Sequence, residues 1–437
     1  MKVRLKSFIH HSLPLTPYSL LLLYLFFSTF TYGRVYIDIN KLGQERIPIA
    51  IPEFMMEGKG ADKIAQKMLS VLKSDLEFTG LFEILPPETF LEKSTAEDTD
   101  FKKWYLIGAH LLVKGSIKTD DSIVEAELSL YDVRLGRRLV GKKYYGQKGQ
   151  CRYIVHKYAD EIMKTLTGEP SIFQTKIAFV CGRSGNKEIY LMDFDGYNVQ
   201  PLTQLNTISL SPTWHPKGDK VLFTSYKGKR PEVYLLDLRS GKIKKLIHYP
   251  GINIAPSFSP DGENIAVTLN KKGRQGIYLV DKKGHIKKCL VEDWGINVSA
   301  SFSPDEKKIA FVSDRGGSPQ IYILDLTAGS INRLTFEGSY NASPVWSPKG
   351  DHIAYTGIMD GHFQIFMIKS NGNNLRQLTY DKVNHESPSF SPDGNFLAFS
   401  QQGKIYVLRL FDGHSFPIGS ISDIQTQPCW SPRLIEK

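Results

Sequence analysis

Six polar residues recur five positions before a repeated aromatic residue, and their side chains are the ones best suited to act together. They are Ser209, Asn253, Asn297, Asn341, His385 and Gln425. Hydroxyl, amide and imidazole groups donate and accept directional hydrogen bonds. If a repeat architecture brings equivalent positions together, these groups meet around one opening, where they could bind a peptide or loop of a partner. The alternative is that Asn and Ser stand there only because they favour loop ends.

Groups that could perform catalysis do not form a recognisable set. The sequence has no P-loop, no dinucleotide-binding fingerprint and no His-Glu-x-x-His motif. The nearest approach to a nucleophile elbow, Gly-Arg-Ser-Gly at 182–185, is interrupted at Asn186. We therefore expect no catalytic residue, no cofactor and no metal ligand.

Two acidic patterns suggest calcium or another metal at first sight. Residues 193–196, Asp-Phe-Asp-Gly, resemble the start of a calcium loop, but the remainder of such a loop is missing. An Asp also closes the third strand of four successive repeats, at 193, 237, 281 and 325. Because Asp readily accepts hydrogen bonds from nearby backbone N–H groups, we interpret both patterns as turns.

The elements that position these residues follow from a repeated phrase, an aromatic residue followed by Ser or His, Pro and, in most copies, a charged residue and Gly. Its aromatic residues are Trp214, Phe258, Phe302, Trp346, Phe390 and Trp430. Successive copies are separated by 44 residues four times and then by 40. A fixed period of this size is typical of stacked supersecondary units that cannot bury their faces alone.

Each repeat contains four predicted strands joined by turns with glycine, which indicates the blade of a propeller. Residues 176–203 supply the last three strands of a blade, and residues 427–432 supply a first strand with nothing after it. Together they complete a sixth blade, so the ring is expected to close between these two segments. The loop at 401–404 is shorter than its equivalents, which predicts a low side of the mouth where a partner could enter.

The first strand of each blade is expected to have a free edge facing the central channel. Five of the six carry a proline two residues before the aromatic, and the sixth carries Ala300. Proline has no N–H to donate to a sheet, so it is confined to strands with an open edge.

Residues 34–168 are predicted to form a separate N-terminal α/β domain of two helices on a small mixed sheet. Apolar residues recur at helical spacing between 61 and 78 and again between 152 and 166. Strands are expected at 35–39, 47–52, 80–85, 110–117, 123–133 and 138–147. Residues 169–175 would link this domain to a propeller at 176–437.

The first 33 residues have the pattern of a cleavable signal peptide, with a basic start, an apolar run at 18–27 and small residues near 31–33. An uncleaved anchor is the alternative. Without the three basic residues of this segment, the formal charge falls from +10 to +7, which is modest for this length and gives no indication of nucleic-acid binding. Export permits disulfides, yet Cys181 and Cys429 fall about three residues out of register, so we expect the four cysteines to be free, buried thiols.

The order of these motifs resembles the TolB family of periplasmic propeller proteins. The resemblance is carried by Phe-Ser-Pro-Asp-Gly at 258–262 and 390–394, Val-Tyr-Ile-Asp-Ile at 35–39, Ile-Ala-Ile-Pro at 49–52, Gly-Leu-Phe at 80–82, Leu-Thr-Gly at 166–168 and the run 173–179. It covers nearly the whole chain after residue 33.

The resemblance implies a binding protein of the Tol-Pal system and not an enzyme. It implies that the propeller mouth binds the peptidoglycan-associated lipoprotein Pal and that the mature N-terminus binds TolA, in support of outer-membrane integrity and constriction at division. Further outer-membrane proteins would be additional partners. Family contacts with Pal correspond here to the segments Asn253 to Ala255 and Val298 to Ser299. The family's N-terminal switch corresponds to Arg34, Val35, Tyr36, Ile37 and Asp38.

The alternative function is an exported hydrolase or lyase that uses the channel as its active site. Peptidases of this architecture carry a hydrolase domain after the propeller, whereas this sequence runs only five residues beyond Pro432. Turnover of peptides or glycans by the unchanged chain, lost in the His385→Ala variant, would favour this alternative.

Overall fold

The computed structural model describes residues 45–91, 99–120, 122–271, 273–419 and 422–434. The expected signal peptide, the strand at 35–39 and the N-terminal switch lie outside these residues. The described residues group into one compact unit. Among the helices of the described part, none is long and apolar enough to cross a lipid bilayer.

The N-terminal domain contains one mixed sheet with the order β3-β1-β4-β5-β6, and β2 pairs with β4. Its strands are β1 (Ile47–Ala50), β2 (Met55–Glu57), β3 (Phe82–Ile84), β4 (Leu111–Thr119), β5 (Ile123–Asp132) and β6 (Arg137–Gln147). β1 runs parallel to β3 and β4, whereas β4, β5 and β6 are antiparallel. This confirms the predicted mixed sheet.

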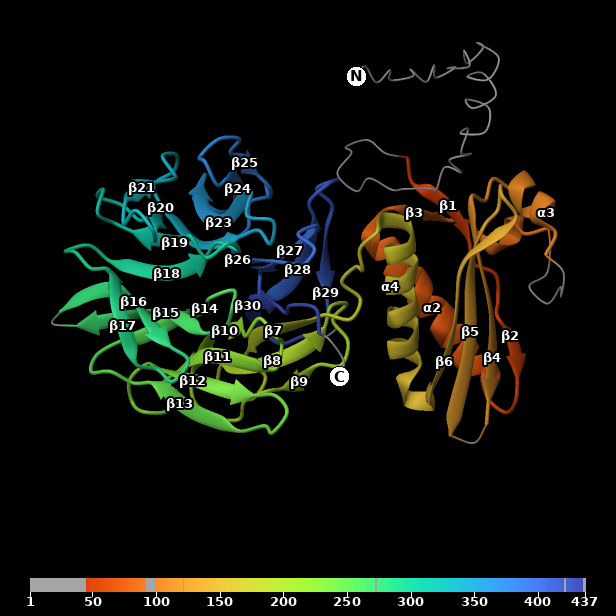
Figure 1. Cartoon of the computed structure of the whole chain (residues 1–437), viewed down its shortest axis with the longest axis horizontal. Coiled ribbons are helices and arrows are strands. Elements are labelled where there is room, and N and C mark those ends of the chain that lie inside the picture. The colour runs from red at the N-terminus through yellow and green to blue at the C-terminus, as the bar shows by residue number, and fades with distance from the viewer. Residues whose placement is uncertain (1–44, 92–98, 121, 272, 420–421, 435–437) are drawn as a thin grey trace, which may run out of the picture. The chain divides into compact units, whose positions relative to one another are not determined.

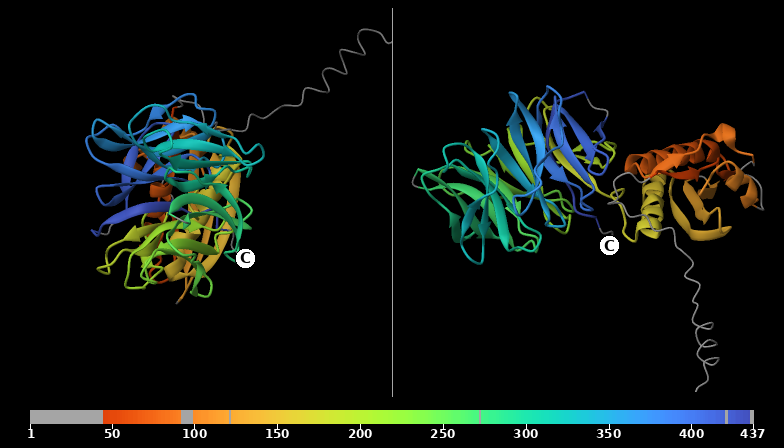
Figure 2. Two further views of the ribbon diagram at one scale, coloured as in Figure 1. Left: turned by 90° about the vertical axis from the view of Figure 1, so that its left-hand side faces the viewer. Right: turned by 90° about the horizontal axis from the view of Figure 1, so that it is seen from above.

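Two long helices, α2 (Ala61–Thr79) and α4 (Cys151–Thr167), cover this sheet and pack against each other (Figure 1). The same layering is visible from above (Figure 2). Each helix buries one apolar stripe, and each ends at a glycine in the left-handed conformation, Gly80 and Gly168. Glycine adopts that conformation without a Cβ penalty, so the predicted ends of both helices are confirmed.

The sequence analysis missed a short third helix, α3 (Phe101–Leu106). The side chain of Asp100 accepts a hydrogen bond from the backbone N–H of Lys102 and so caps its first turn. Trp104 is buried in a small apolar cluster with Ala50 and Leu112. A helix this short has no apolar periodicity to detect, and it forms because tertiary burial of Trp104 holds it. Single-turn 3₁₀ helices lie at Pro87–Thr89 (η1) and Lys148–Gln150 (η2).

The remaining strands form six four-stranded sheets, which confirms the six-bladed propeller. Blades 1 to 3 are β10 (Ser209–Trp214), β11 (Lys220–Ser225), β12 (Glu232–Asp237) and β13 (Ile243–Ile247); β14 (Asn253–Phe258), β15 (Asn264–Lys271), β16 (Arg274–Asp281) and β17 (Ile286–Val291); β18 (Asn297–Phe302), β19 (Lys308–Ser313), β20 (Gln320–Asp325) and β21 (Ile331–Arg333). Blades 4 and 5 are β22 (Asn341–Trp346), β23 (His352–Met359), β24 (His362–Lys369) and β25 (Arg376–Gln377); β26 (His385–Phe390), β27 (Phe396–Gln401), β28 (Lys404–Arg409) and β29 (Ser415–Ile418). Blade 6 is β30 (Gln425–Trp430), β7 (Lys176–Cys181), β8 (Glu188–Asp193) and β9 (Gln200–Pro201).

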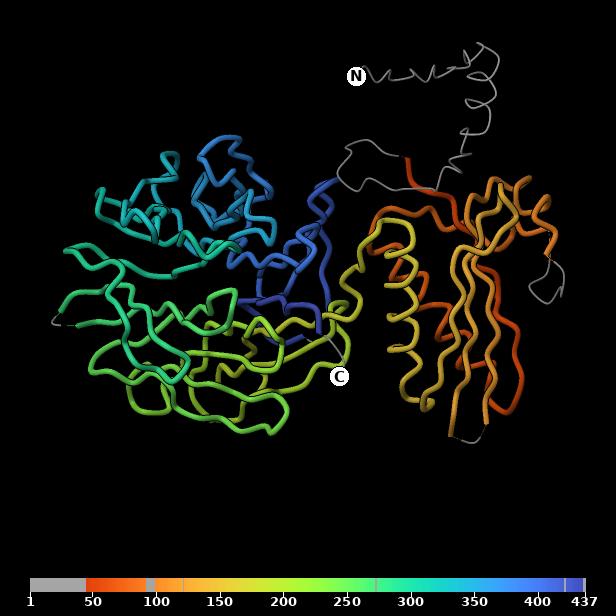
Figure 3. Tube along the Cα trace, in the orientation of Figure 1, coloured from red at the N-terminus to blue at the C-terminus, as the bar shows by residue number. Residues whose placement is uncertain are grey.

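The ring closes as predicted, because β30 joins β7 in antiparallel register with Trp430 opposite Ile177. Figure 3 shows this dark-blue end of the chain beside the yellow-green start of the propeller. The indole Nε1 of Trp430 donates to Oγ1 of Thr175 at 2.8 Å, and the backbone N–H of Lys176 donates to Oγ of Ser431 at 2.9 Å. These bonds join residues about 255 positions apart and hold the two ends of the ring together.

The apolar core of the propeller lies between neighbouring blades. One cluster joins Leu222 of blade 1 to Val267 of blade 2, and another joins Met367 of blade 4 to Phe399 of blade 5. Strand residues alternate between the two faces of a blade, so each blade packs on both neighbours. This explains the near-continuous apolar runs in the second and third strands.

The repeated phrase and the repeated Asp both serve turns. In blade 2 the hydroxyl of Ser259 donates to Asp261, whose carboxylate also accepts from the backbone N–H of Glu263, and the same two-bond pattern recurs at Ser303. Asp237, Asp281 and Asp325 each accept backbone N–H bonds from the turn that follows, which confirms the capping interpretation at these three positions. At the fourth it is wrong, because the carboxylate of Asp193 accepts from the side chains of Lys176 and Asn198 instead. These backbone bonds hold the pKa of Asp281 below its ordinary value because they favour the charged carboxylate.

The four cysteines are free, but not all are buried. Cys429 lies opposite Ala178 and not Cys181, which confirms the predicted offset of three residues. Cys289 is exposed on the outer strand β17 and Cys429 is half-buried, so the expectation of buried thiols holds only for Cys151 and Cys181. An outer strand faces solvent on one side, and repeat position alone does not say which side a residue takes.

Candidate functional site

The six polar residues singled out in the sequence are the first residues of the six inner strands, β10, β14, β18, β22, β26 and β30. Each inner strand is the edge strand of its blade, and neighbouring inner strands contact one another around the ring. The six positions therefore surround one end of the channel, which we call the mouth. Ring symmetry gathers them as the repeat predicts.

The side chains of four of these residues, Asn253, Asn297, Asn341 and His385, contact the loop that precedes them, whereas the hydroxyl of Ser209 donates to Ser225 on β11. All six residues are buried. The amide of Asn253 donates to the carbonyl of Tyr249 at 2.8 Å and its oxygen accepts from the N–H of the same residue. Asn297 donates to Asp293, Asn341 to the carbonyl of Glu337, and His385 pairs with Asp381. In each case the contact is to the residue four positions earlier, so these side chains fix the shape of the loop that enters the inner strand.

The histidine at this position, His385, is buried and pairs with Asp381. Burial lowers the pKa of its imidazole, and the carboxylate of Asp381 opposes that shift. The contact between His385 Nε2 and Asp381 is 3.1 Å long. This is the same loop-closing contact that the amides make in the other blades.

Every inner strand contains a β-bulge, which no feature of the repeat predicted. The register shifts between the second and the fifth residue of each strand. The third residue has a positive φ in all six blades, at Ser211, Ala255, Ser299, Ser343, Ser387 and Gln427. This conformation costs a non-glycine residue about 1–3 kcal/mol and is enriched at functional sites.

The bulges connect neighbouring blades at the mouth. The backbone N–H of Ala255 in blade 2 donates to Oγ1 of Thr224 in blade 1 at 3.3 Å, and Ser387 in blade 5 donates to Thr356 in blade 4 at 3.1 Å. At the closing blade, Oε1 of Gln427 accepts from Ser211 at 2.7 Å. A bulge frees backbone groups from the ladder of its own sheet, and here they bind the adjacent blade instead.

Large apolar side chains stand exposed on the loops that enter the inner strands. Trp294 is 88% exposed, Tyr380 75%, Phe336 73% and Ile424 68%. Ile208 and Ile296, directly before two of the buried polar residues, are exposed as well. We call these six residues the apolar crown. Exposed aromatic residues gathered on one face are typical of protein-binding surfaces.

Part of this crown follows a repeated sequence position. The position directly before each buried polar residue holds Ile208, Ile252, Ile296, Tyr340, Asn384 and Ile424. In blade 1 the carbonyl of Ile208 accepts from the N–H of Tyr226, and in blade 4 that of Tyr340 accepts from Ile358. The loop between the second and third strands thus holds the crown loop in place. As predicted, this connection is shorter in blade 5, because β27 (Phe396–Gln401) and β28 (Lys404–Arg409) have six residues each, whereas β23 (His352–Met359) and β24 (His362–Lys369) in blade 4 have eight.

The family-derived contact residues lie at the same mouth. Ala255 and Ser299 are the bulge residues of blades 2 and 3, and Val298 precedes the second of these. All three are half-buried. Asn253 and Asn297 lie beneath them with their amides bonded inside the loops.

A second polar cluster joins the helices of the N-terminal domain to blade 6. His156 on α4 contacts Asp75 on α2 at 2.8 Å, and Arg152 donates to Asp195 in the turn after β8. Asp75, His156 and Asp195 each offer one ligand atom within 4.8 Å of the others. The guanidinium of Arg152 already supplies a cation there, and it stacks on Tyr197 with 3.8 Å to the ring centroid. Asp195 is therefore more than a turn residue.

Burial raises the pKa of Asp75 in this cluster to about 6 from its ordinary 3.8. His156 and Arg152 oppose the shift, while Asp195 adds to it. Because the folded state favours the protonated acid, the contribution of Asp75 to the free energy of unfolding decreases as pH rises from about 4 to about 6. A shift of about two pKa units corresponds to about 3 kcal/mol.

Replacing Asp75 with Asn removes this titration. Between pH 4 and pH 7 we expect the free energy of unfolding of the variant to gain about 2–3 kcal/mol relative to the unchanged chain. Urea unfolding at a series of pH values measures this difference. Asp281→Asn is the control with the opposite sign, since its pKa is lowered and its contribution is lost as pH falls. Parallel stability profiles for Asp75→Asn and the unchanged chain would contradict the assignment.

Known proteins share both domains of this chain. The family model described as the TolB beta propeller domain matches residues 163–434, and the model of the TolB amino-terminal domain matches residues 35–139. The solved structure of TolB from Acinetobacter baumannii superposes with a TM-score of 0.78 at 29% sequence identity, covering 90% of this chain and 98% of that one.

Curated relatives match over shorter stretches. The Tol-Pal system protein TolB of Desulfosudis oleivorans is 39% identical over 199 residues, which is 44% of this chain and 45% of the relative. The protein of the same name from Syntrophotalea carbinolica is 37% identical over 198 residues, or 44% of this chain and 46% of the relative. The matched stretches thus span less than half the length of these relatives.

Proposed function

This chain belongs to the TolB family, and from that premise we propose that it is a periplasmic interaction protein of a Tol-Pal system that binds Pal at the propeller mouth. The observation that carries the proposal is the apolar crown. Its aromatic and aliphatic side chains are exposed although burial of each would be favourable by about 1.5–3 kcal/mol. A docked partner would bury them.

The buried polar ring supports this surface without touching the partner. Hydrogen bonds from the side-chain amides hold the crown loops in one conformation, and the hydrogen bonds of the bulges hold each blade against the next. A binding surface built on rigid elements loses little conformational entropy when it docks. The partner would therefore contact the crown and the bulge residues. The Asn and His side chains would be positioning residues that hold the crown loops without contacting the partner.

The second part of the proposal concerns TolA. We assign its binding to the mature N-terminus, residues 34–38, which lie outside the described residues; the assignment rests on the family alone. Through these two contacts the protein would support outer-membrane integrity and constriction during cell division. The propeller would act as a binding protein and not as an enzyme.

Deleting residues 34–40 tests the assignment of two partners to two surfaces. We expect the deletion to abolish binding of purified TolA, to leave Pal affinity within about threefold, and to leave the thermal unfolding transition of the ring unchanged. Titration calorimetry with each partner measures the first two, and scanning calorimetry the third. Loss of Pal binding together with TolA binding, at an unchanged transition, would contradict two separate surfaces.

A further inference from the structure

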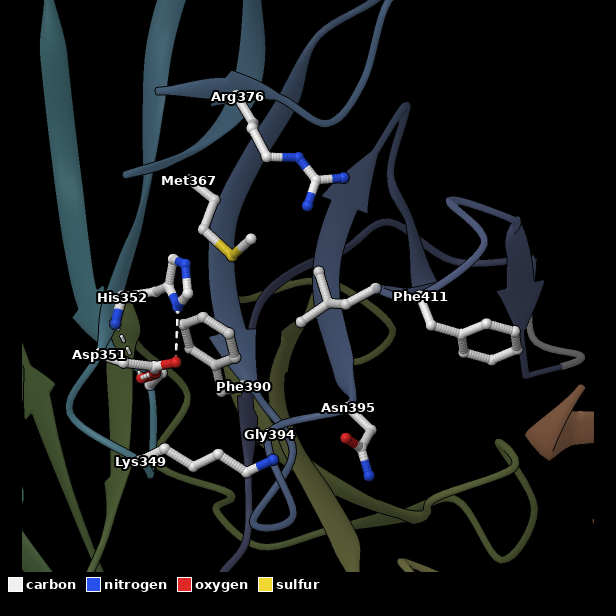
Figure 4. Close-up of a pocket in the computed structure, with 11 residues that line it drawn as sticks. Lys349, Asp351, His352, Met367, Arg376, Phe390, Gly394, Asn395 and Phe411 are labelled. Atoms are coloured by element: carbon white, nitrogen blue, oxygen red, sulfur yellow. Dashed lines mark hydrogen bonds and ion pairs between the residues drawn. The ribbon is translucent and has the colours of Figure 1, made fainter. Parts of the chain in front are cut away.

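At the end of the propeller opposite the mouth, a groove lies between blades 4 and 5. Inner strands begin at the mouth, so the loop after Trp346 belongs to the opposite end. The cavity encloses about 290 Å³. Its floor is apolar, with Met367, Phe390 and Leu410, and Lys349 and Arg376 stand at its rim. Figure 4 shows the two cations at opposite ends of the cavity with Met367 and Phe390 between them.

The equivalent grooves between other blades can be compared position by position. Met367 pairs with Arg376 in blade 4, as Val407 pairs with Phe416 in blade 5 and Leu191 with Gln200 in blade 6. Three of these equivalent grooves are filled by a large side chain. We name each groove by its two blades.

The 5/6 groove is filled from the N-terminal domain. Phe78 of α2 packs on Phe396, Phe416 and Phe194, with ring centroids 5.3, 5.0 and 5.2 Å away. Phe396 has the same position in β27 that His352 has in β23 at the groove between blades 4 and 5. Likewise, Phe416 in β29 corresponds to Arg376 in β25. An aromatic side chain from a different part of the chain is thus the occupant there.

The 6/1 groove is filled by the segment after β30. Leu434 packs on the cluster that contains Leu191, Trp214 and Leu238. A Cβ on Gly218 would lie 2.5 Å from Cδ2 of Leu434, which shows how closely Leu434 approaches this turn. The occupant is again one apolar side chain, this time from a segment without regular secondary structure.

The 1/2 groove is filled by its own loop. His215, at the position of Ser347, makes an edge-to-face contact with Phe258, with 4.9 Å between ring centroids. Its Nε2 lies 2.5 Å from where a Cβ on Gly262 would stand. Between blades 4 and 5 the equivalents are Ser347, Phe390 and Gly394, and serine is too short to reach the floor.

We propose that the 4/5 groove is a docking site for an acidic peptide segment of a partner, which inserts one leucine or phenylalanine side chain between Lys349 and Arg376. The apolar side chain is argued from the occupants of the 5/6 and 6/1 grooves, Phe78 and Leu434. The acidic flanks are argued from charge, since the side chains of Lys349 and Arg376 make no ion pair or hydrogen bond to any described residue, whereas the one carboxylate of the lining, Asp351, is paired with His352 and Ser347. This site is separate from the mouth and from residues 34–38, and it does not depend on binding of Pal or TolA at those places.

The test selects peptides from a random phage-displayed library on the purified chain without residues 1–33. We expect enrichment of sequences with Leu or Phe between Asp or Glu residues. A fluorescein-labelled enriched peptide should lose at least about tenfold in affinity on Lys349→Glu with Arg376→Glu, and should weaken as salt rises. The matched control is Lys217→Glu with Lys244→Glu, the equivalent cations at the filled 1/2 groove, which should leave affinity unchanged.

A second variant fills the groove while keeping its charge. Ser347→His copies the residue that fills the 1/2 groove, where His215 contacts Asp219 as the new side chain would contact Asp351. We expect it to fold as blade 1 does and to weaken the peptide by at least about tenfold.

Three results would overturn the proposal. One is enrichment of basic or uncharged peptides, and another is peptide binding that neither variant changes. The third is tight binding of phosphatidylglycerol vesicles by the same cations with no enrichment of acidic peptides. If deleting residues 34–44 strengthened peptide binding about tenfold, a segment of the chain itself would be the occupant, and the partner would be ruled out.

Discussion

Replacing Trp430 with alanine is expected to lower the free energy of unfolding by about 3–5 kcal/mol and to release β30 from blade 6 before the rest of the ring unfolds. Trp430 is 5% exposed and packs near Phe396 with ring centroids 6.3 Å apart. Its loss leaves a cavity and removes the bond to Thr175. Because β30 and β7 are joined only by non-covalent contacts, local opening needs no unfolding of another blade.

Cys429, next to Trp430, reports this opening. Burial raises the pKa of its thiol to about 11, so it reacts slowly while β30 is paired. Denaturant unfolding gives the stability loss, and the labelling rate of Cys429 relative to exposed Cys289 gives the local opening.

The matched control is Trp346→Ala, which removes the equivalent side chain, 7% exposed, from a blade whose strands follow one another in sequence. We expect a similar loss of stability there but continued protection of Cys429. Equal labelling of Cys429 in both variants would show that the closing strand is no weaker than any other.

Replacing Trp294 with alanine is expected to weaken Pal binding by at least about tenfold, with little change in the melting temperature. The side chain is 88% exposed, so it contributes little to folding, and its ring lies 4.0 Å from the guanidinium of Arg274, which holds it in place. A rigid exposed tryptophan is the kind of residue whose truncation commonly costs more than 2 kcal/mol at an interface. Titration calorimetry with purified Pal gives the affinity.

Leu106→Ala is the control, since Leu106 on α3 is 75% exposed but belongs to the N-terminal domain. Asn253→Asp with Asn297→Asp should also weaken Pal by at least about tenfold, through loss of the donors that hold two crown loops. Unchanged Pal affinity in all mouth variants would reject the mouth as the site.

The sequence alone determined the number of blades, their strand order and the closure by the C-terminal segment, although the closing strand β30 is Gln425–Trp430 and not 427–432. These features follow from a regular period, because turn residues and strand patterning act locally and repeat with each blade. It also determined where the six polar residues lie, since ring symmetry places equivalent positions around one opening.

Only the tertiary structure decided which way those side chains point and what fills the space between blades. Asn253 and its equivalents turn into their loops because a buried amide must find hydrogen-bond partners, and the nearest ones lie four residues back. Phe78, Leu434 and His215 fill three similar grooves from three unrelated places in the chain. No local pattern encodes such contacts, because they depend on which distant segment the fold brings to each groove.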